Sequence, residues 1–129
     1  MTDVYIIEDH PIVREMLEVL VNGSPGMHVC GSADSGKTAL RELSQAGADV
    51  VLVDVSLPDV DGIELVKSIA AICPEAKALI VSGHAQAVYA DRALAAGARG
   101  YFVKGSNAPL AEAIHTVLGG AIYRAAEAV

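Results

Sequence analysis

The sequence predicts an α/β protein with a doubly wound, five-stranded parallel sheet, and three observations lead to that class. Five short apolar runs alternate along the 129 residues with segments whose apolar residues recur at helical spacing. The third run, Val50–Val53, is apolar without alternation, as in a strand buried on both faces of a parallel sheet. The connections are short, so right-handed crossovers place helices on both faces of an open sheet.

Each expected element has a local signal in the sequence. Pro11 stands at a helix start, where proline is tolerated, and Pro74 follows the end of the third helix. Asp34 or Ser35 can cap the second helix, and Gly47 ends it. In chain order we expect strand Val4–Ile7, a helix from Pro11 to Asn22, strand His28–Gly31, a helix ending at Gly47, strand Val50–Val53, a helix carrying Ile63 to Ile72, strand Ala78–Val81, helix Ala85–Ala96, strand Gly100–Val103 and a last helix from Asn107 or Pro109 to Leu118.

The composition excludes several classes of protein. A net charge of −7 argues against direct binding to nucleic acid, which needs a basic face, and against binding to an anionic membrane surface. No apolar run approaches the roughly 18 residues of a membrane span, and no signal peptide opens the chain. We therefore expect a cytoplasmic protein with reduced thiols at Cys30 and Cys73.

Polar side chains follow four of the expected strands at their carboxyl ends. Glu8 and Asp9 follow the first strand, Asp54 the third, Ser82 the fourth and Lys104 the fifth. Because a doubly wound sheet binds its ligand at this edge, we expect the five side chains to converge. Clustered carboxylates favour a hard divalent cation such as Mg²⁺, and a central carboxylate can attack a phosphoryl group. The pattern therefore indicates phosphoryl chemistry centred on Asp54.

At this point the chain resembles bacterial two-component response-regulator receiver domains, from Asp3 to about Gly120. The matched stretches are IIEDHPIVREML, VVLVDVSLPDVDGIELV, LIVSGHA and ALAAGARGYFVKG. The EDHP and GYFVKG segments are most similar to those of NarL/FixJ-type regulators. The resemblance implies a flavodoxin-like fold with strand order 2-1-3-4-5. It also implies a receiver domain over residues 1–120, followed by a tail or linker over residues 121–129.

The resemblance implies a role for each residue at the strand ends. Asp54 would be the phosphoacceptor, receiving its phosphoryl group from a sensor histidine kinase. Asp9 and Asp54 would ligate Mg²⁺ together with the backbone carbonyl of Ser56, and Glu8 would act largely through water. Lys104 would pair with the phosphoryl group. Such a domain is not an enzyme beyond slow phosphorylation and dephosphorylation of itself.

The resemblance also implies a switch. Ser82 would be the switch hydroxyl, and Tyr101 the switch aromatic that turns inward once Ser82 moves. The fourth helix, fifth strand and fifth helix would then change their contacts with partners, with homodimer formation on phosphorylation as one outcome. Any contact with DNA, and with it transcriptional regulation, would belong to a helix-turn-helix domain outside this chain.

Three positions depart from the commonest family pattern, and a fourth, His84, lies beside the expected site. Glu8 replaces an aspartate, and Ser82 stands where threonine is frequent. Gly105 follows the lysine in place of a proline, which argues against a cis peptide bond and favours a looser loop. His84 lies two residues after Ser82, at the mouth of the expected site, where it is either a solvated loop residue or an influence on phosphate lifetime.

Three other functions compete with the receiver interpretation. Residues Gly31–Thr38 (GSADSGKT) fit the phosphate-binding loop of nucleotide hydrolases, but that function leaves the polar strand ends unexplained. A haloacid-dehalogenase-like phosphohydrolase needs a second aspartate two residues after the first, where this chain has Ser56. A receiver fold could also serve as an interaction module without phosphorylation, although the complete acidic group argues against that use.

Overall fold

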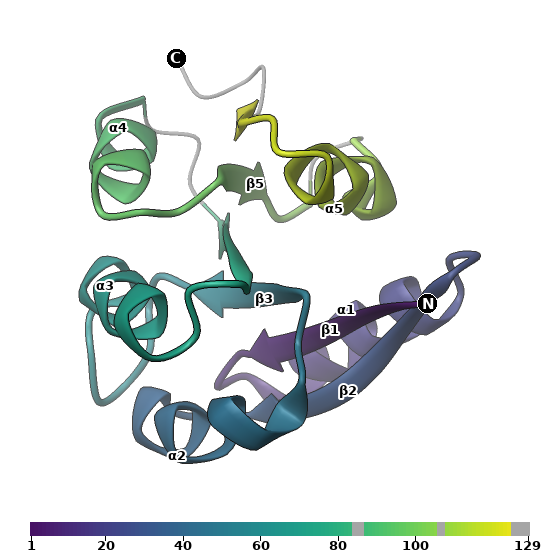
Figure 1. The fold of residues 1–129 in the computed structure, drawn as a ribbon, viewed down its shortest axis with the longest axis horizontal. Coiled ribbons are helices and arrows are strands. Elements are labelled where there is room, and N and C mark those ends of the chain that lie inside the picture. Colours follow the sequence, from purple (N-terminus) through teal and green to yellow (C-terminus); the bar gives the residue numbers. More distant parts are fainter. Residues whose placement is uncertain (84–86, 106–107, 125–129) are drawn as a thin grey trace.

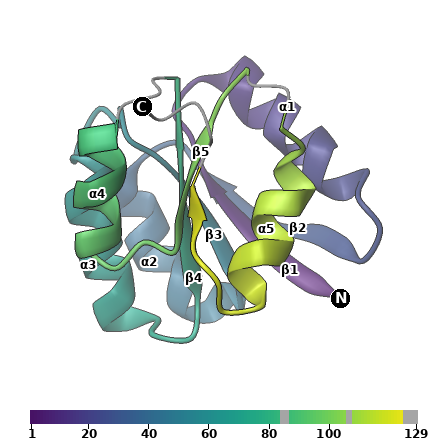
Figure 2. The same cartoon turned by 90° about the horizontal axis from the view of Figure 1, so that it is seen from above.

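A six-stranded parallel sheet lies between two layers of helices in the computed structural model, which describes residues 1–83, 87–105 and 108–124 (Figure 1). Helices α1 and α5 cover one face, and α2, α3 and α4 cover the other (Figure 2). The strands are β1 (Thr2–Ile7), β2 (Met27–Ala33), β3 (Val50–Asp54), β4 (Lys77–Ser82), β5 (Gly100–Val103) and β6 (Tyr123–Arg124). The helices are α1 (Pro11–Asn22), α2 (Gly36–Ala46), α3 (Gly62–Ile72), α4 (Ala87–Ala95) and α5 (Leu110–Leu118).

The strand order is β2-β1-β3-β4-β5-β6, so the predicted order of the first five strands is confirmed. The sequence predicts five strands, and β6 is a sixth. It has only two residues, too few to show an apolar strand pattern, and it lies within residues 121–129. The register pairs Ile7 with Val53 and Ser82 with Val103, which brings the carboxyl ends of β1, β3, β4 and β5 to one edge of the sheet.

Aliphatic side chains from both faces of the sheet form two core clusters. Strand β3 shows the division clearly, because Val51 and Val53 pack under α2, α3 and α4, whereas Val50 and Leu52 pack under α1 and α5. All five β3 residues are buried, as the unbroken apolar run predicts. Cys30 and Cys73 are half-buried free thiols.

The local signals at the helix ends are mostly confirmed. Pro11 is in the first turn of α1, and Gly47 ends α2 with a left-handed φ of 66°. Ser35, not Asp34, caps α2, because its side chain accepts a hydrogen bond from the Thr38 amide at 3.2 Å. The expected helix starts at Ala85 and Asn107 lie outside the described residues. No helix in the described part of the chain is long and apolar enough to cross a membrane.

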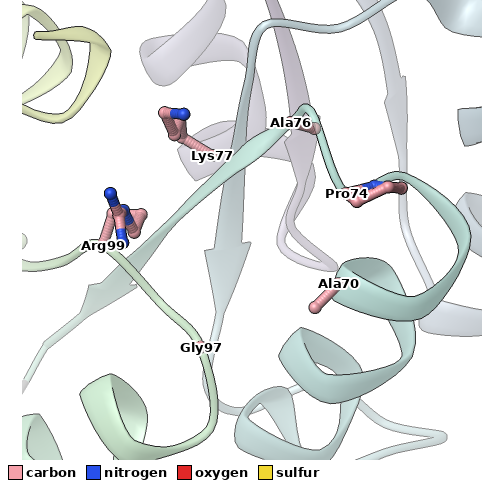
Figure 3. Close-up of a pocket in the computed structure, with 6 residues that line it drawn as sticks. All are labelled: Ala70, Pro74, Ala76, Lys77, Gly97 and Arg99. Carbon is pink, nitrogen blue, oxygen red and sulfur yellow. The ribbon is translucent and has the colours of Figure 1, made fainter. Parts of the chain in front are cut away.

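A cavity of about 290 Å³ lies at the amino ends of β4 and β5, the edge of the sheet opposite the polar strand ends (Figure 3). Lys77 and Arg99 supply its charged groups, and none of the described residues that line it is acidic. Helices α3 and α4 end beside it, and cations at the carboxyl ends of helices complement the helix dipole. The positive charge at this end of the sheet therefore complements the dipoles of these helices. The remaining lining residues are Ala70, Pro74, Ala76 and Gly97.

Candidate functional site

Four side chains with metal-binding atoms meet at the carboxyl ends of β1 and β3. Glu8, Asp9, His10 and Asp54 each offer one such atom, and these atoms all lie within 4.8 Å of one another. Glu8 is 0 % exposed and Asp54 is 3 % exposed. Buried carboxylates need nearby positive charge or strong hydrogen bonds. The sheet therefore holds the predicted acids together in a place where their charges must be compensated.

Lys104, at the end of β5, supplies part of that compensation. Its Nζ lies 2.7 Å from Glu8 Oε1 and 3.3 Å from Asp54 Oδ1. Burial by itself would lower the pKa of Lys104. The hydrogen bond to Glu8 and the negative charge of Asp54 outweigh that effect, so the pKa is raised above its usual value. The ammonium group therefore stays charged and joins the two buried carboxylates.

Three buried oxygens of the acidic group lack a hydrogen bond among the described residues: Glu8 Oε1, Asp9 Oδ1 and Asp54 Oδ2. Glu8 Oε1 has the ion pair with Lys104, and Asp9 Oδ1 has His10 Nδ1 at 3.3 Å, whereas Asp54 Oδ2 has neither kind of contact within the described part of the chain. An unsatisfied buried carboxylate oxygen is costly, and a hard divalent cation would satisfy that of Asp9, with Asp54 as a second ligand that keeps one oxygen available. Lys104 alone cannot balance three carboxylates. The donor set therefore fits Mg²⁺, with the two aspartates as its direct ligands.

His10 is part of this arrangement, although it is not among the metal ligands that the sequence predicts. Its Nδ1 lies 3.3 Å from both Glu8 Oε2 and Asp9 Oδ1, and its backbone amide donates to Glu8 Oε2 at 3.3 Å. Arg14 of α1 donates from Nη1 to the Glu8 carbonyl at 2.8 Å. The signal available in the sequence is position alone, because both residues follow the acids within the first turn of α1. Glu8 is thus held by His10, Arg14 and Lys104.

The remaining predicted site residues lie around this group. Ser56 is exposed, and its amide donates to Asp54 Oδ1 at 3.3 Å. Ser82 is buried, and its carbonyl accepts from the Lys104 amide at 2.7 Å. Tyr101 is fully buried, and its ring belongs to the core cluster under α2, α3 and α4.

Two expectations concern the loops beside the site. Gly105 has a φ of 76°, which fits the looser loop expected after the lysine, and the described residues contain no cis peptide bond. His84 lies outside the described residues.

Gly62, at the start of α3, allows the helix to approach the end of β3. A Cβ at this position would lie 2.6 Å from both the Asp54 carbonyl oxygen and Val55 Cα. Because both neighbours are backbone atoms, Gly62→Ala is expected to lower the free energy of unfolding by about 1–3 kcal/mol. Urea unfolding checks this, with Gly119→Ala as the control, since its nearest neighbour would be 3.6 Å away. Equal losses in the two variants would contradict the close approach.

The segment that resembles a phosphate-binding loop has a different partner in this fold. The amides of Gly36 and Lys37, in the first turn of α2, donate to the two carboxylate oxygens of Asp59, each at 2.9 Å. These bonds, first that from Gly36 and then that from Lys37, hold the pKa of Asp59 below its usual value. Asp59 therefore ties the loop between β3 and α3 to the amino end of α2, where the helix dipole favours an anion.

Asp59 should contribute stability that depends on pH. Since its pKa is lower in the folded state, the contribution is complete above the unfolded pKa of about 3.9 and is lost as pH falls through the folded value. Asp59→Asn should lower the free energy of unfolding near neutral pH by about 0.5 kcal/mol, since the carboxylate is exposed and screened. The gap between wild type and variant should shrink below about pH 4. Urea unfolding at pH 6 and pH 3 measures it, and a gap that widens at pH 3 would contradict the assignment.

Comparisons with known proteins agree with this geometry. The response regulator receiver domain family matches residues 4–115. The transcriptional regulatory protein UhpA of Salmonella typhimurium is 38 % identical over 125 residues, which cover 95 % of this chain and 62 % of UhpA. The response regulator GacA of Pseudomonas viridiflava is 33 % identical over 124 residues, which cover 95 % of this chain and 58 % of GacA. The chain thus spans about three-fifths of the length of these two curated relatives.

A solved structure gives the same result for the fold. The LuxR-family two-component response regulator from Aurantimonas is 33 % identical and superposes with a TM-score of 0.93, over 99 % of this chain and 93 % of that one. The isolated receiver domain of RcsB from Salmonella enterica, at 23 % identity and a TM-score of 0.89, has the same fold. The chain belongs to the response regulator receiver domain family.

Proposed function

We propose that Asp54 accepts a phosphoryl group from a phosphohistidine of a sensor histidine kinase in a Mg²⁺-dependent reaction. One observation carries the proposal. The buried Asp54 carboxylate has Oδ1 bound by Lys104 at 3.3 Å, whereas Oδ2 has no hydrogen-bond partner among the described residues. An oriented carboxylate with one oxygen left available is suited to nucleophilic attack.

The reaction exchanges one bond to phosphorus for another. Asp54 Oδ2 forms a bond to phosphorus as the bond between phosphorus and the imidazole nitrogen of the donor breaks, and the imidazole leaves with that electron pair. Lys104 pairs with a phosphoryl oxygen, and the Ser82 hydroxyl donates to another. Bound Mg²⁺, held by Asp9, Asp54, the Ser56 carbonyl and, through water, Glu8, would neutralise charge on the transferring group. Hydrolysis of the product is slow because Ser56 stands where a second acid would be needed.

The phosphorylated state then acts through α4, β5 and α5. Ser82 ends β4 and Tyr101 lies on β5, so a new bond to the Ser82 hydroxyl biases the position of the neighbouring ring and of α4. The altered face recruits a partner or a second copy of the chain. Relatives such as UhpA are named as transcriptional regulators, which supports a transcriptional output through a DNA-binding domain outside this chain. The kinase partner implies that this chain works in the cytoplasm.

Phosphorylation can be tested with a small donor. The protein is incubated with acetyl phosphate, with and without Mg²⁺, and its intact mass is followed together with the release of free phosphate. We expect one phosphoryl adduct per chain, formed only when Mg²⁺ is present. Phosphate release over many turnovers without an adduct would instead support a phosphohydrolase. If neither an adduct nor turnover is observed, the result would support an interaction module that works without phosphorylation.

A further inference from the structure

The short strand β6 extends the sheet beyond β5 after the chain leaves α5. Figures 1 and 2 both show it beside β5, in the space between α4 and α5. The strands run parallel with Gly100 opposite Tyr123 and Tyr101 opposite Arg124, and the Tyr123 amide donates to the Arg99 carbonyl at 3.0 Å. The outer edge of β5 is therefore covered by a segment of the same chain.

Two side chains fix β6 in this place. The ring of Tyr123 packs against the ring of Phe102, with 6.3 Å between their centroids. Arg124 Nη1 lies 2.6 Å from Asp91 Oδ1 on α4, so the ion pair joins β6 to a helix that borders β5. Gly100 allows the close approach, because a Cβ there would lie 3.0 Å from the Tyr123 carbonyl oxygen. Backbone, core and charge contacts thus all hold the same two residues.

The contacts of β6 restrict where the ring of Tyr101 can move. The ring is fully buried in the core cluster that contains Ala90 and Ala93 of α4, and Arg124 is the register partner of Tyr101. The Arg124–Asp91 ion pair connects the strand outside β5 with the helix above the ring. Movement of the ring outward between α4 and the edge of the sheet would have to displace that connection.

We propose that β6 is a strap that keeps the Tyr101 ring in its inward position and thereby favours the phosphorylated state of the domain. This proposal rests on the proposed function and on the inward turn of Tyr101 that the family resemblance implies for the phosphorylated state. Coupling between two sites is reciprocal. A strap that favours phosphorylation must therefore be held more firmly once Asp54 carries a phosphoryl group, and its loss must weaken binding of a phosphoryl mimic.

The test uses the full chain and beryllofluoride with Mg²⁺ as the probe. The variants are Tyr123→Pro, which removes the amide that bonds to Arg99, Arg124→Ala, Asp91→Ala, and the charge exchange Asp91→Arg with Arg124→Asp. Lys67→Ala is the matched control, because Lys67 forms a comparable exposed ion pair with Glu64 on α3, at 3.1 Å. For each variant we measure the beryllofluoride concentration at which half of the protein has bound it (the midpoint). Unfolding by urea gives the stability of the same variants. Hydrogen exchange of the Tyr123 amide is followed in the proteins that retain it.

The expected shifts follow from the strength of the contacts. Breaking the exposed ion pair should raise the midpoint about threefold in Arg124→Ala and Asp91→Ala, and the charge exchange should restore it. Tyr123→Pro should raise it about tenfold, since it breaks the strand itself. Beryllofluoride should slow exchange of the wild-type Tyr123 amide by about threefold or more. Lys67→Ala should match the wild type.

Two results would overturn the strap. One is a wild type that binds beryllofluoride while the β6 variants bind it equally or more tightly. The other is an exchange rate of the Tyr123 amide that beryllofluoride leaves unchanged. A wild type that neither binds beryllofluoride nor forms an adduct with acetyl phosphate would overturn the proposed function, and the strap with it. A loss of stability in urea with an unchanged midpoint would show that β6 is structural only.

Discussion

Replacing Asp54 with asparagine is expected to abolish the acetyl phosphate adduct completely and to stabilise the folded protein when Mg²⁺ is absent. The amide cannot act as the nucleophile, so no phosphoryl group is retained. Asparagine also removes one of three clustered carboxylates and leaves Lys104 paired with Glu8 at 2.7 Å. Relief of repulsion between buried like charges should raise the free energy of unfolding by about 1 kcal/mol.

Intact mass and urea unfolding in a chelator measure the two effects of Asp54→Asn separately. Asp59→Asn is the matched control, because it neutralises an exposed aspartate in the loop after β3 that contacts α2, outside the acidic group. That control should retain the adduct and lose a little stability. An adduct that persists in Asp54→Asn would place the phosphoacceptor on another residue. A marked loss of stability in the same variant would mean that the acidic group is not under repulsive strain.

Replacing Lys104 with alanine is expected to be the most destabilising change at the site. Lys104 joins Glu8, which is 0 % exposed, to Asp54, and its own side chain is 19 % exposed. Removal leaves both carboxylates buried without their shared cation, which should lower the free energy of unfolding by about 3 kcal/mol. The rate of adduct formation should also fall roughly a hundredfold, because a cation that stabilises the transferring phosphoryl group is lost.

A second substitution distinguishes loss of charge balance from loss of packing. Glu8→Gln combined with Lys104→Ala removes one buried negative charge with the positive one, so most of the lost stability should return. The rate of adduct formation should stay low in the double variant, because the cation is still absent. Lys67→Ala, which breaks an exposed ion pair, gives the reference for a surface lysine. A Lys104→Ala variant as stable as Lys67→Ala would contradict the structural role of the buried pair.

The sequence predicts the fold well because its signals are periodic and local. Unbroken apolar runs identify buried parallel strands such as β3, and the parallel arrangement brings Glu8, Asp9, Asp54, Ser82 and Lys104 to one edge of the sheet. Strand ends are therefore informative about a site even before side-chain geometry is known. The chemistry of the acidic group follows from residue types that the printed sequence already shows.

The unpredicted features depend on long-range contacts or on very short segments. Glu8 appears in the sequence as a metal-binding acid, but the structure also surrounds it with His10, Arg14 and Lys104. Asp59 bonds to an amide 23 positions earlier in the chain, and no local pattern indicates that partner. Strand β6 has only two residues, too few for a periodic pattern, and its pairing with β5 defines it.

Asp59 lies in the loop after β3, and its carboxylate is bound at the start of α2. It therefore competes with other anions for the segment GSADSGKT. A ligand attached to the same chain acts at an effective concentration of millimolar or higher, because it needs no diffusion to reach its site. Free phosphate or nucleotide would have to displace this internal ligand from the amides of Gly36 and Lys37. The resemblance to a nucleotide-binding loop thus describes a self-occupied anion site, already saturated by the chain itself.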